Sequence, residues 1–250
     1  MRRYWVPKEC VSGDEVRIVG DTLHHIRDVC RLRKGARFEV LVEGRGALFV
    51  VIEAESKHES VARVLEERKL PELPKPYIHL ALSIPRFPVF EAVLEKSVEL
   101  GVKAVHPFFS DFSFIRTQDD VFAKKRPRFE KIVVGATQQT GRGDLMPIAE
   151  PVHIKELLQA FNRLDSAKGL FAYEGEHVLT AKEGVQKLRD AAPQDIWIFV
   201  GSEGGFSDSE VQLFASHGLE AVTLGNQVLR VETACVTLVS IIKYDFDLMR

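Results

Sequence analysis

Residues 196–210 carry the pattern that indicates the fold most clearly. They are Ile-Trp-Ile-Phe-Val-Gly-Ser-Glu-Gly-Gly-Phe-Ser-Asp-Ser-Glu. A run of apolar residues is typical of a strand buried on both faces, and the glycines that follow permit a tight turn. Ser207 and Glu210 have the spacing of a capping box, which predicts that a helix begins there. The stretch is therefore a strand, a loop and a helix of a parallel α/β sheet.

The sequence around this unit alternates between strand and helix patterns. Apolar runs predict strands at residues 78–84, 102–109, 169–173 and 221–224. Helices are predicted at residues 88–100, 124–139, 207–218 and 232–246, with another beginning at the capping box of Thr180 and Glu183. This alternation indicates an α/β domain with a parallel sheet that is covered on both faces.

The N-terminal part of the chain has a different pattern. Residues 70–76 are Leu-Pro-Glu-Leu-Pro-Lys-Pro, which neither a helix interior nor a central strand tolerates, so they read as a linker. Before them, short β-rich runs at 37–41, 47–53 and 60–65 predict a small β-barrel, with a hairpin turn at 43–46. We expect two domains, residues 1–72 and residues 73–250.

Composition limits the classes of protein. The chain has 250 residues, 45% of them apolar, and a formal charge of −2. It contains neither a signal peptide pattern nor an apolar run long enough to span a membrane, which predicts a cytoplasmic protein without a membrane partner. Cys10, Cys30 and Cys235 are too far apart for a zinc or redox pair, so reduced thiols and no metal are expected.

Two local basic clusters could meet a nucleic acid in spite of the near-neutral charge. They lie within residues 27–37 and 124–142. Solvated protein faces also collect positive charge, so an ordinary surface is the alternative for each cluster. The residues predicted to bind a nucleic acid are Arg31, Arg33, Lys34, Lys125, Arg126 and Arg142.

The predicted ligand site lies where loops leave the carboxyl ends of the strands. The loops after residues 173, 200 and 224 qualify, and the last continues as Leu-Gly-Asn-Gln-Val-Leu-Arg-Val-Glu-Thr-Ala. The glycine loop lacks the G-x-G-x-x-G and Gly-Lys-Ser/Thr patterns, which argues against dinucleotides and nucleoside triphosphates. A plain turn is its alternative interpretation. For the last loop, the alternative is that Glu232 complements the next helix and Arg230 pairs with it.

At these residues the sequence resembles the RsmE family, which methylates the N3 atom of a uridine in 16S ribosomal RNA and belongs to the SPOUT superfamily. The likeness covers nearly the whole chain. It is carried by residues 24–35, similar to "HH..VLR...G", 95–107, similar to "EK..ELGV…P", 139–147, similar to "Q..R…P", 200–207, similar to "GPEGG", and 224–234, similar to "LG..LR.ETA".

The chain departs from the family pattern at three places. Ser202 stands where proline is usual, the stretch at 141–147 is a residue longer, and residues 111–117 match poorly. The glycines of the first loop and the arginine of the second are all retained.

The resemblance implies an N-terminal PUA-like RNA-binding β-barrel and a C-terminal SPOUT α/β domain with a trefoil knot, a rare exception to unknotted topology. It also implies a homodimer that binds S-adenosylmethionine and acts on 16S ribosomal RNA or the small ribosomal subunit. The expected cofactor-binding residues are Leu170, Val200, Gly201, Ser202, Gly204, Gly205, Leu224, Gly225, Val228, Leu229, Arg230 and Thr233.

The chemistry of such a reaction assigns roles to charged residues. Uridine N3 carries a proton and becomes nucleophilic when that proton leaves, which calls for a base or for a cation that stabilises the anion. Arg230 is the first candidate for the cation, and Glu232 or Glu203 for the base. Two other functions stay open: an inactive RNA-binding ribosome-assembly protein, and a hydrolase that uses Ser202.

Overall fold

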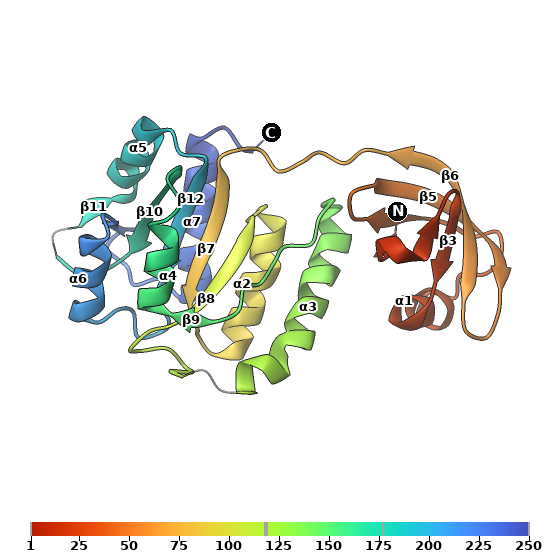
Figure 1. The fold of residues 1–250 in the computed structure, drawn as a ribbon, viewed down its shortest axis with the longest axis horizontal. Coiled ribbons are helices and arrows are strands. Elements are labelled where there is room, and N and C mark those ends of the chain that lie inside the picture. Colours follow the sequence, from red (N-terminus) through yellow and green to blue (C-terminus); the bar gives the residue numbers. More distant parts are fainter. Residues whose placement is uncertain (1, 118–119, 177, 250) are drawn as a thin grey trace. The chain divides into compact units, whose positions relative to one another are not determined.

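The computed structural model describes residues 2–117, 120–176 and 178–249. The chain forms two compact units, drawn in Figure 1. The first consists of Met1–Glu72 and Val134–Leu145, and the second of Leu73–Val133 and Met146–Arg250.

The first unit is built on a six-stranded sheet in the order β1-β4-β5-β6-β3-β2. The strands are β1 (Arg3–Trp5), β2 (Val11–Ser12), β3 (Glu15–Ile18), β4 (Arg37–Val42), β5 (Gly46–Glu55) and β6 (Ser60–Arg68). The predicted hairpin joins β4 and β5, where Gly44 and Gly46 have positive φ angles. Among the strands described, β1 and β2 are the two edges, so the sheet is a curled half-barrel and not a closed barrel.

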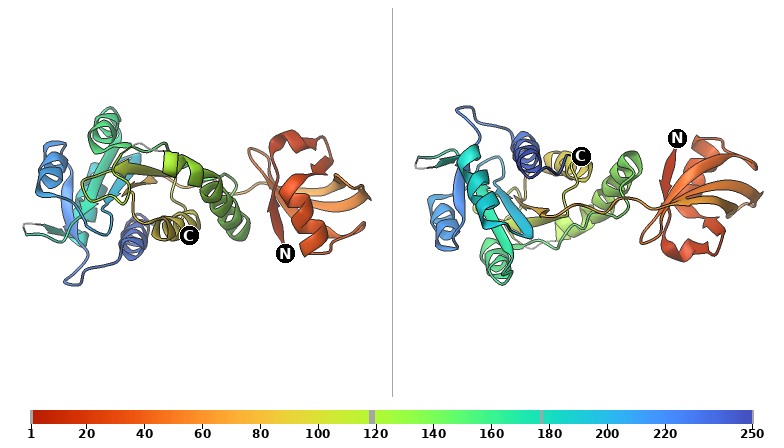
Figure 2. Two further views of the ribbon diagram at one scale, coloured as in Figure 1. Left: turned by 90° about the horizontal axis from the view of Figure 1, so that it is seen from below. Right: turned by 90° about the horizontal axis from the view of Figure 1, so that it is seen from above.

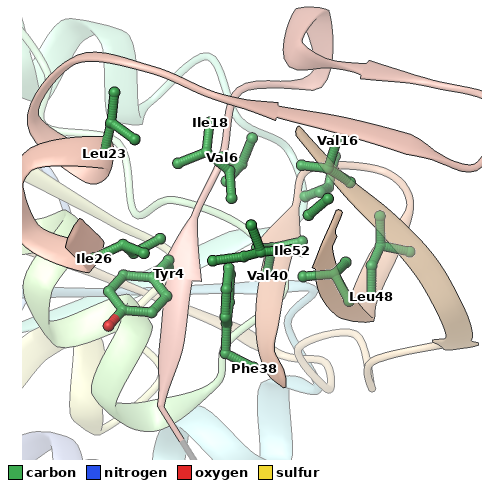
Figure 3. Packing of buried hydrophobic residues seen from close by; sticks show 13 residues of the cluster. Tyr4, Val6, Val16, Ile18, Leu23, Ile26, Phe38, Val40, Leu48 and Ile52 are labelled. Atoms are coloured by element: carbon green, nitrogen blue, oxygen red, sulfur yellow. The ribbon is translucent and has the colours of Figure 1, made fainter. Parts of the chain in front are cut away.

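The concave side of this sheet encloses an apolar core (Figure 3). Phe38, Val40 and Leu48 are fully buried in it. A short 3₁₀ turn, η1 (Lys8–Cys10), and a helix, α1 (Gly20–His24), which continues as the π-helical turn η2 (His25–Val29), complete the unit. The sequence patterns did not predict this helix, although its Leu23 and Ile26 close the core.

Residues 134–145 also belong to the first unit, whereas the sequence placed them in the 73–250 domain. They include the end of helix α3 (Asp120–Thr140). Val134 and Leu145 pack on a small cluster that contains Trp5, and the Gln138 side chain accepts a hydrogen bond from the Trp5 backbone N–H at 3.1 Å. This packing is long-range, so periodicity within the helix did not reveal it.

The second unit contains a seven-stranded sheet in the order β11-β13-β10-β12-β7-β8-β9. Its strands are β7 (Tyr77–Ser83), β8 (Ala104–Phe109), β9 (Val152–His153), β10 (Ala167–Ala172), β11 (Leu179–Thr180), β12 (Asp195–Val200) and β13 (Glu220–Thr223). Every neighbouring pair is parallel, which confirms the predicted sheet type. The short strands β9 and β11 were not predicted.

Helices cover both faces of this sheet: α2 (Phe87–Glu99), α4 (Ile154–Phe161), α5 (Ala181–Ala191), α6 (Asp208–Ser216) and α7 (Val231–Asp245). Figure 2 shows α4 and α6 on one face and α2 and α7 on the other. Both predicted capping boxes are formed, at Thr180 and at Ser207. On the α4 and α6 face, Phe171, Phe199 and Phe214 form an aromatic core. Helix α4 was not predicted.

The strand order places the carboxyl ends of β13, β10, β12 and β7 side by side. Loops that are far apart in the sequence therefore meet at one edge of the sheet, where ligands of parallel α/β folds bind. Within the described part of the chain, no helix is long and apolar enough to cross a bilayer.

Candidate functional site

A cavity of about 650 Å³ opens at this edge of the second unit. Its volume lies within the range of small-molecule sites. It is bounded by the loops after β7, β10, β12 and β13 and by the first turn of α7. The predicted cofactor-binding residues that line it are Val200, Gly201, Ser202, Gly204, Gly205, Leu224, Gly225, Val228, Leu229 and Arg230.

The β12–α6 loop, residues 201–206, is a tight turn that is bonded to itself. The Gly205 N–H donates to the Ser202 carbonyl at 2.9 Å, and Gly205 has a φ of +69°. A Cβ on Gly201 would lie 2.9 Å from the Gly205 backbone, closer than real side chains approach. Both glycines are therefore needed for the turn, which brings bare backbone to the cavity.

Ser202 has a structural role in this loop. Its hydroxyl donates to the Phe112 carbonyl at 2.6 Å, and the residue is only 5% exposed. A serine nucleophile needs a base that accepts its proton and an accessible oxygen. Since the hydroxyl is buried and donates to a carbonyl, the hydrolase hypothesis loses its nucleophile. The hydroxyl anchors the loop to the segment that contains Phe112.

Glu203 is also engaged with the protein. Its carboxylate accepts a hydrogen bond from the Arg86 backbone N–H at 3.1 Å. Arg86 is the residue before α2, so the negative charge lies at the positive end of that helix. This interaction fixes the loop against the end of β7 and favours a structural role for Glu203.

The β13–α7 loop, residues 224–230, is more open. Its described hydrogen bonds are few: Thr223 Oγ1 donates to the Gly225 carbonyl at 3.1 Å and accepts from the Gly225 N–H at 3.3 Å. Gly225 has a φ of +120°, which side-chain-bearing residues rarely adopt. Val228 is 79% exposed. An exposed apolar residue on a weakly bonded loop marks a surface that a ligand can cover.

Arg230 and Glu232 both line the cavity where the loop enters α7. Arg230 is the exposed residue that precedes the helix, and Glu232 is half-buried in its first turn. In the part of the chain that the structure describes, neither side chain forms an ion pair or a hydrogen bond, so the pairing between them that would explain both residues structurally is not formed. Both charges are available to a ligand.

Two predicted residues lie elsewhere. Leu170 is 1% exposed and packs beside Gly184 of α5, because it lies two residues before the end of β10. Thr233 is exposed but does not line the cavity, since it follows Glu232 by about 100° around α7. The strand end itself, Ala172, lines the cavity instead.

Sequence reasoning also missed cavity residues contributed by the segments that follow β7 and β10. They include Arg86, Val89, Tyr173 and Glu174. Arg86 is the most informative, because it is exposed and its guanidinium has no partner among the described residues. It lies two residues after the end of the predicted strand at 78–84, so the rule that ligands bind at strand ends could have identified it.

The predicted RNA-binding residues differ in whether other groups of the protein already engage their side chains. Arg31 and Lys34 are exposed, and the Arg33 guanidinium donates to the Arg27 carbonyl at 3.0 Å. Lys125 lies over the Phe87 ring, 5.8 Å from its centre.

Arg126 and Arg142 are held within the protein. Arg126 pairs with Glu150 at 2.7 Å, and Arg142 pairs with Asp144 at 2.8 Å with a side chain only 6% exposed. These two are poorly placed for phosphates. Over residues 2–117, 120–176 and 178–249, no cluster of His, Cys, Asp and Glu side chains could hold a metal ion.

Comparison with known proteins assigns this fold and cavity to a class. The model of the RNA methyltransferase domain family matches residues 71–243. Ribosomal RNA small subunit methyltransferase E of Mesomycoplasma hyopneumoniae is 32% identical, over 88% of this chain and 89% of the relative. The chain thus belongs to the RNA methyltransferases and, among them, to the family of ribosomal RNA small subunit methyltransferase E.

Two solved structures share the fold over nearly the whole chain. One is a ribosomal RNA small subunit methyltransferase E from Neisseria gonorrhoeae bound to S-adenosyl methionine, with 26% identity, a TM-score of 0.83 and coverage of 98% of this chain and 97% of that one. The other is a putative methyltransferase from Legionella pneumophila in complex with the same cofactor, with 27% identity, a TM-score of 0.84 and coverage of 97% of each chain.

Proposed function

We propose that this protein transfers the methyl group of S-adenosylmethionine to N3 of a uridine in 16S ribosomal RNA. The observation that carries the proposal is the cavity at the sheet edge, where glycine backbone, apolar side chains and the charged residues Arg230 and Glu232 meet. Membership in the methyltransferase family supports the reaction class, and the cofactor in the Neisseria relative supports the identity of the donor.

The residues of the cavity fit this cofactor. Gly201, Gly204 and Gly225 have no Cβ, so backbone N–H and carbonyl groups can approach a ligand closely. Val200, Leu224 and Leu229 offer apolar walls for an adenine ring. We also propose the trefoil knot of the SPOUT fold for this domain, with the β12–α6 and β13–α7 loops in it.

When bound, the cofactor supplies an electrophilic methyl group on a sulfonium. The protein then has to orient the uracil and remove the N3 proton. Glu232 is the proposed proton acceptor, because Glu203 is occupied by the Arg86 N–H. Arg230 remains charged at any working pH and stabilises the imide anion as it forms. Arg86 is a second cation on the same cavity that can bind the substrate's phosphate or carbonyl oxygens.

In the proposal, exposed cations on the protein surface hold the RNA. Arg31, Arg33 and Lys34 serve in the first unit and Lys125 in the second, whereas Arg126 and Arg142 stabilise the protein. Each lost phosphate contact lowers the dependence of affinity on salt. Neutralising Arg31, Arg33 and Lys34 together should therefore flatten the slope of log affinity against log salt by about 2 to 3 units, while an unchanged slope would make them ordinary surface charges.

We further propose that the protein works as a homodimer in the cytoplasm. The alternative, an inactive RNA-binding assembly factor, would tolerate loss of the glycines and of Arg230, and this chain retains all of them.

The experiment that tests the function is mass-spectrometric mapping of 16S ribosomal RNA from a strain without the gene, before and after treatment of its small subunits with the purified protein and labelled cofactor. A single 3-methyluridine should be missing in the strain and restored in vitro with the label. Binding of the cofactor without methylation of any nucleotide would instead support the assembly factor.

A further inference from the structure

Two phenylalanines are exposed on the loop that follows β8. Phe112 and Phe114 are 44% and 55% exposed. Leaving large aromatic rings in water forgoes the free energy of burying them, so neighbouring exposed rings mark a binding surface. The residues between and after them, Ser113 and Ile115, are buried. The loop thus exposes its two aromatic side chains to solvent, while the buried residues between and after them attach it to the protein.

The backbone under the two rings is held firmly. The hydroxyls of Ser83, Ser110 and Ser113 form a buried hydrogen-bonded cluster with distances of 2.6 to 3.1 Å. The Phe114 N–H donates to the Ile84 carbonyl at 2.8 Å. Such a loop presents its side chains in a fixed arrangement, so little entropy is lost when a partner binds to them.

The rings lie next to the candidate active site. The Ser202 hydroxyl donates to the Phe112 carbonyl, and a Cβ on Gly204 would lie 2.8 Å from the Phe112 Cβ. Both Ser202 and Gly204 line the cavity. Phe112 therefore contacts the loop that lines the cavity, and Phe114 follows it two residues further along the chain.

Two positively charged residues lie on the segments that carry or contact these rings. Phe114 meets the Phe87 ring edge-on, with centres 5.8 Å apart, and Lys125 lies over Phe87. Arg116 is exposed on the same loop. The nearby carboxylate of Asp111 is turned to α6, where the Ser207 hydroxyl donates to it at 2.6 Å. Aromatic faces interleaved with cations fit single-stranded nucleic acid, whose bases stack while its phosphates bind the cations.

We infer that Phe112 and Phe114 form a stacking ledge for unpaired RNA bases beside the target nucleotide, with Lys125 and Arg116 binding the phosphates. The inference rests on the proposed function for its RNA substrate. The ledge would hold the strand open next to the cavity, so that the target uridine can enter it without its neighbours re-pairing. A second copy of the chain is the competing occupant, but the cations favour a polyanion.

The test measures the binding of a fluorescein-labelled 12-nucleotide oligouridylate and of a 12-base-pair RNA duplex at one fixed salt concentration. We expect Phe112→Leu and Phe114→Leu each to weaken binding of the single strand by about 5- to 150-fold, the range for loss of one base–aromatic stack, with duplex binding unchanged. Phe114→Tyr, which keeps the ring, should bind as the wild type does. Tyr244→Leu is the matched control, because Tyr244 is a 79% exposed aromatic residue outside the cavity.

A strand with abasic positions distinguishes stacking from general damage. The wild type and the leucine variants should bind it equally, because no base remains to stack. Cofactor affinity, measured by calorimetry, should stay unchanged in Phe114→Leu and Phe114→Tyr, because Phe114 lies outside the residues that line the cavity.

Single-strand affinity in the leucine variants equal to that of Tyr244→Leu would overturn the ledge. So would their conversion from dimer to monomer in sedimentation, which would make the rings a subunit contact. If the wild type methylates no ribosomal RNA but the ring-dependent binding persists, the proposed function fails and the ledge stands.

Discussion

The two glycine-containing loops at the edge of the parallel sheet differ in how they are held. The β12–α6 loop is bonded to itself, to Phe112 through Ser202 and to Arg86 through Glu203, and ends in a capping box. The β13–α7 loop has the hydrogen bonds of Thr223 with Gly225 and exposes Val228.

This difference indicates that the first loop mainly stabilises the fold and that the second loop mainly contacts the ligand. The Ser202 and Glu203 side chains of the first loop are engaged by the protein, so that loop offers a ligand mainly its backbone, whereas the open loop ends in charged side chains that a ligand can bind. We therefore expect changes in the first loop to lower stability, and changes in the second to lower cofactor affinity or turnover.

The largest expected effect is that of Arg230→Ala, at the end of the open loop. If Arg230 stabilises the uracil anion, its interaction strengthens in the transition state, so turnover should fall by about a hundred- to thousand-fold. Cofactor affinity should stay within a few-fold, and the melting temperature should be unchanged. Single-turnover methyl transfer at saturating cofactor, beside calorimetry and a thermal melt, measures all three.

Glu232→Gln removes the proposed proton acceptor, so it should also lower turnover while cofactor affinity and the melting temperature stay unchanged. A purely structural role of Arg230 and Glu232 predicts that both substitutions lose cofactor binding and melt early. Near-normal turnover of Arg230→Ala would end its catalytic assignment.

A pair of histidines links β7 and β8 in the parallel sheet, and it predicts how stability depends on pH. His79 Nδ1 lies 3.1 Å from His106 Nε2. Burial first, and then the charge of His79, lower the pKa of His106 from its ordinary 6.5 to about 4. Burial also lowers the pKa of His79, against the opposing effect of Asp195.

Because the folded pKa is depressed, the unfolded chain binds more protons, so this stability is full above pH 6.5 and is lost as the pH falls towards about 4. Between pH 7.5 and 5 the free energy of unfolding should fall by roughly 2 kcal/mol through His106. Urea unfolding at both pH values measures the loss, and His106→Phe should reduce it. Equal losses in the wild type and the variant would remove His106 as the cause.

The third prediction contrasts one glycine from each loop. Gly201→Ala places a Cβ against the Gly205 backbone, which should lower the free energy of unfolding by about 1 to 3 kcal/mol. Gly225→Ala meets no close atom but strains a backbone at φ +120°. That strain should appear mainly in the open loop, as a fall in cofactor affinity of about 5- to 150-fold.

Urea unfolding and calorimetry on both variants test the contrast. Gly135→Ala in α3 is the control, because its Cβ meets nothing within 4 Å. Similar stability losses in the Gly201 and Gly225 variants would show that the two loops are equally part of the scaffold.

The smallest expected effect is that of Glu203→Gln. The amide oxygen can still accept from the Arg86 N–H, so only the favourable charge at the start of α2 is lost, about 0.3 to 1 kcal/mol of stability. Turnover should stay within a few-fold of the wild type. A hundred-fold loss of turnover with normal stability would make Glu203 the base in place of Glu232.

Local sequence patterns were sufficient to predict a helix or strand wherever interactions between residues close in the sequence determine it. Thr180 with Glu183 and Ser207 with Glu210 marked two helix starts, because each capping box closes within one turn of chain. The apolar run at 196–200 marked β12, since a strand covered on both faces has apolar residues throughout. The sequence patterns did not predict the short helix α4. Its eight residues lack clear start and stop signals, and their packing against the aromatic core stabilises the helix.

By itself, the sequence determined the parallel sheet, the hairpin between β4 and β5 and the two loops that line the cavity, because these depend on residue spacing along the chain. Only the tertiary structure decided which residues meet. It brought Arg86 and Arg230 to the cavity, kept Leu170 away from it and engaged the side chains of Glu203 and Ser202. Those outcomes depend on strand order and long-range packing, since contacts between distant segments are set by which strands lie side by side and not by the pattern within any one of them.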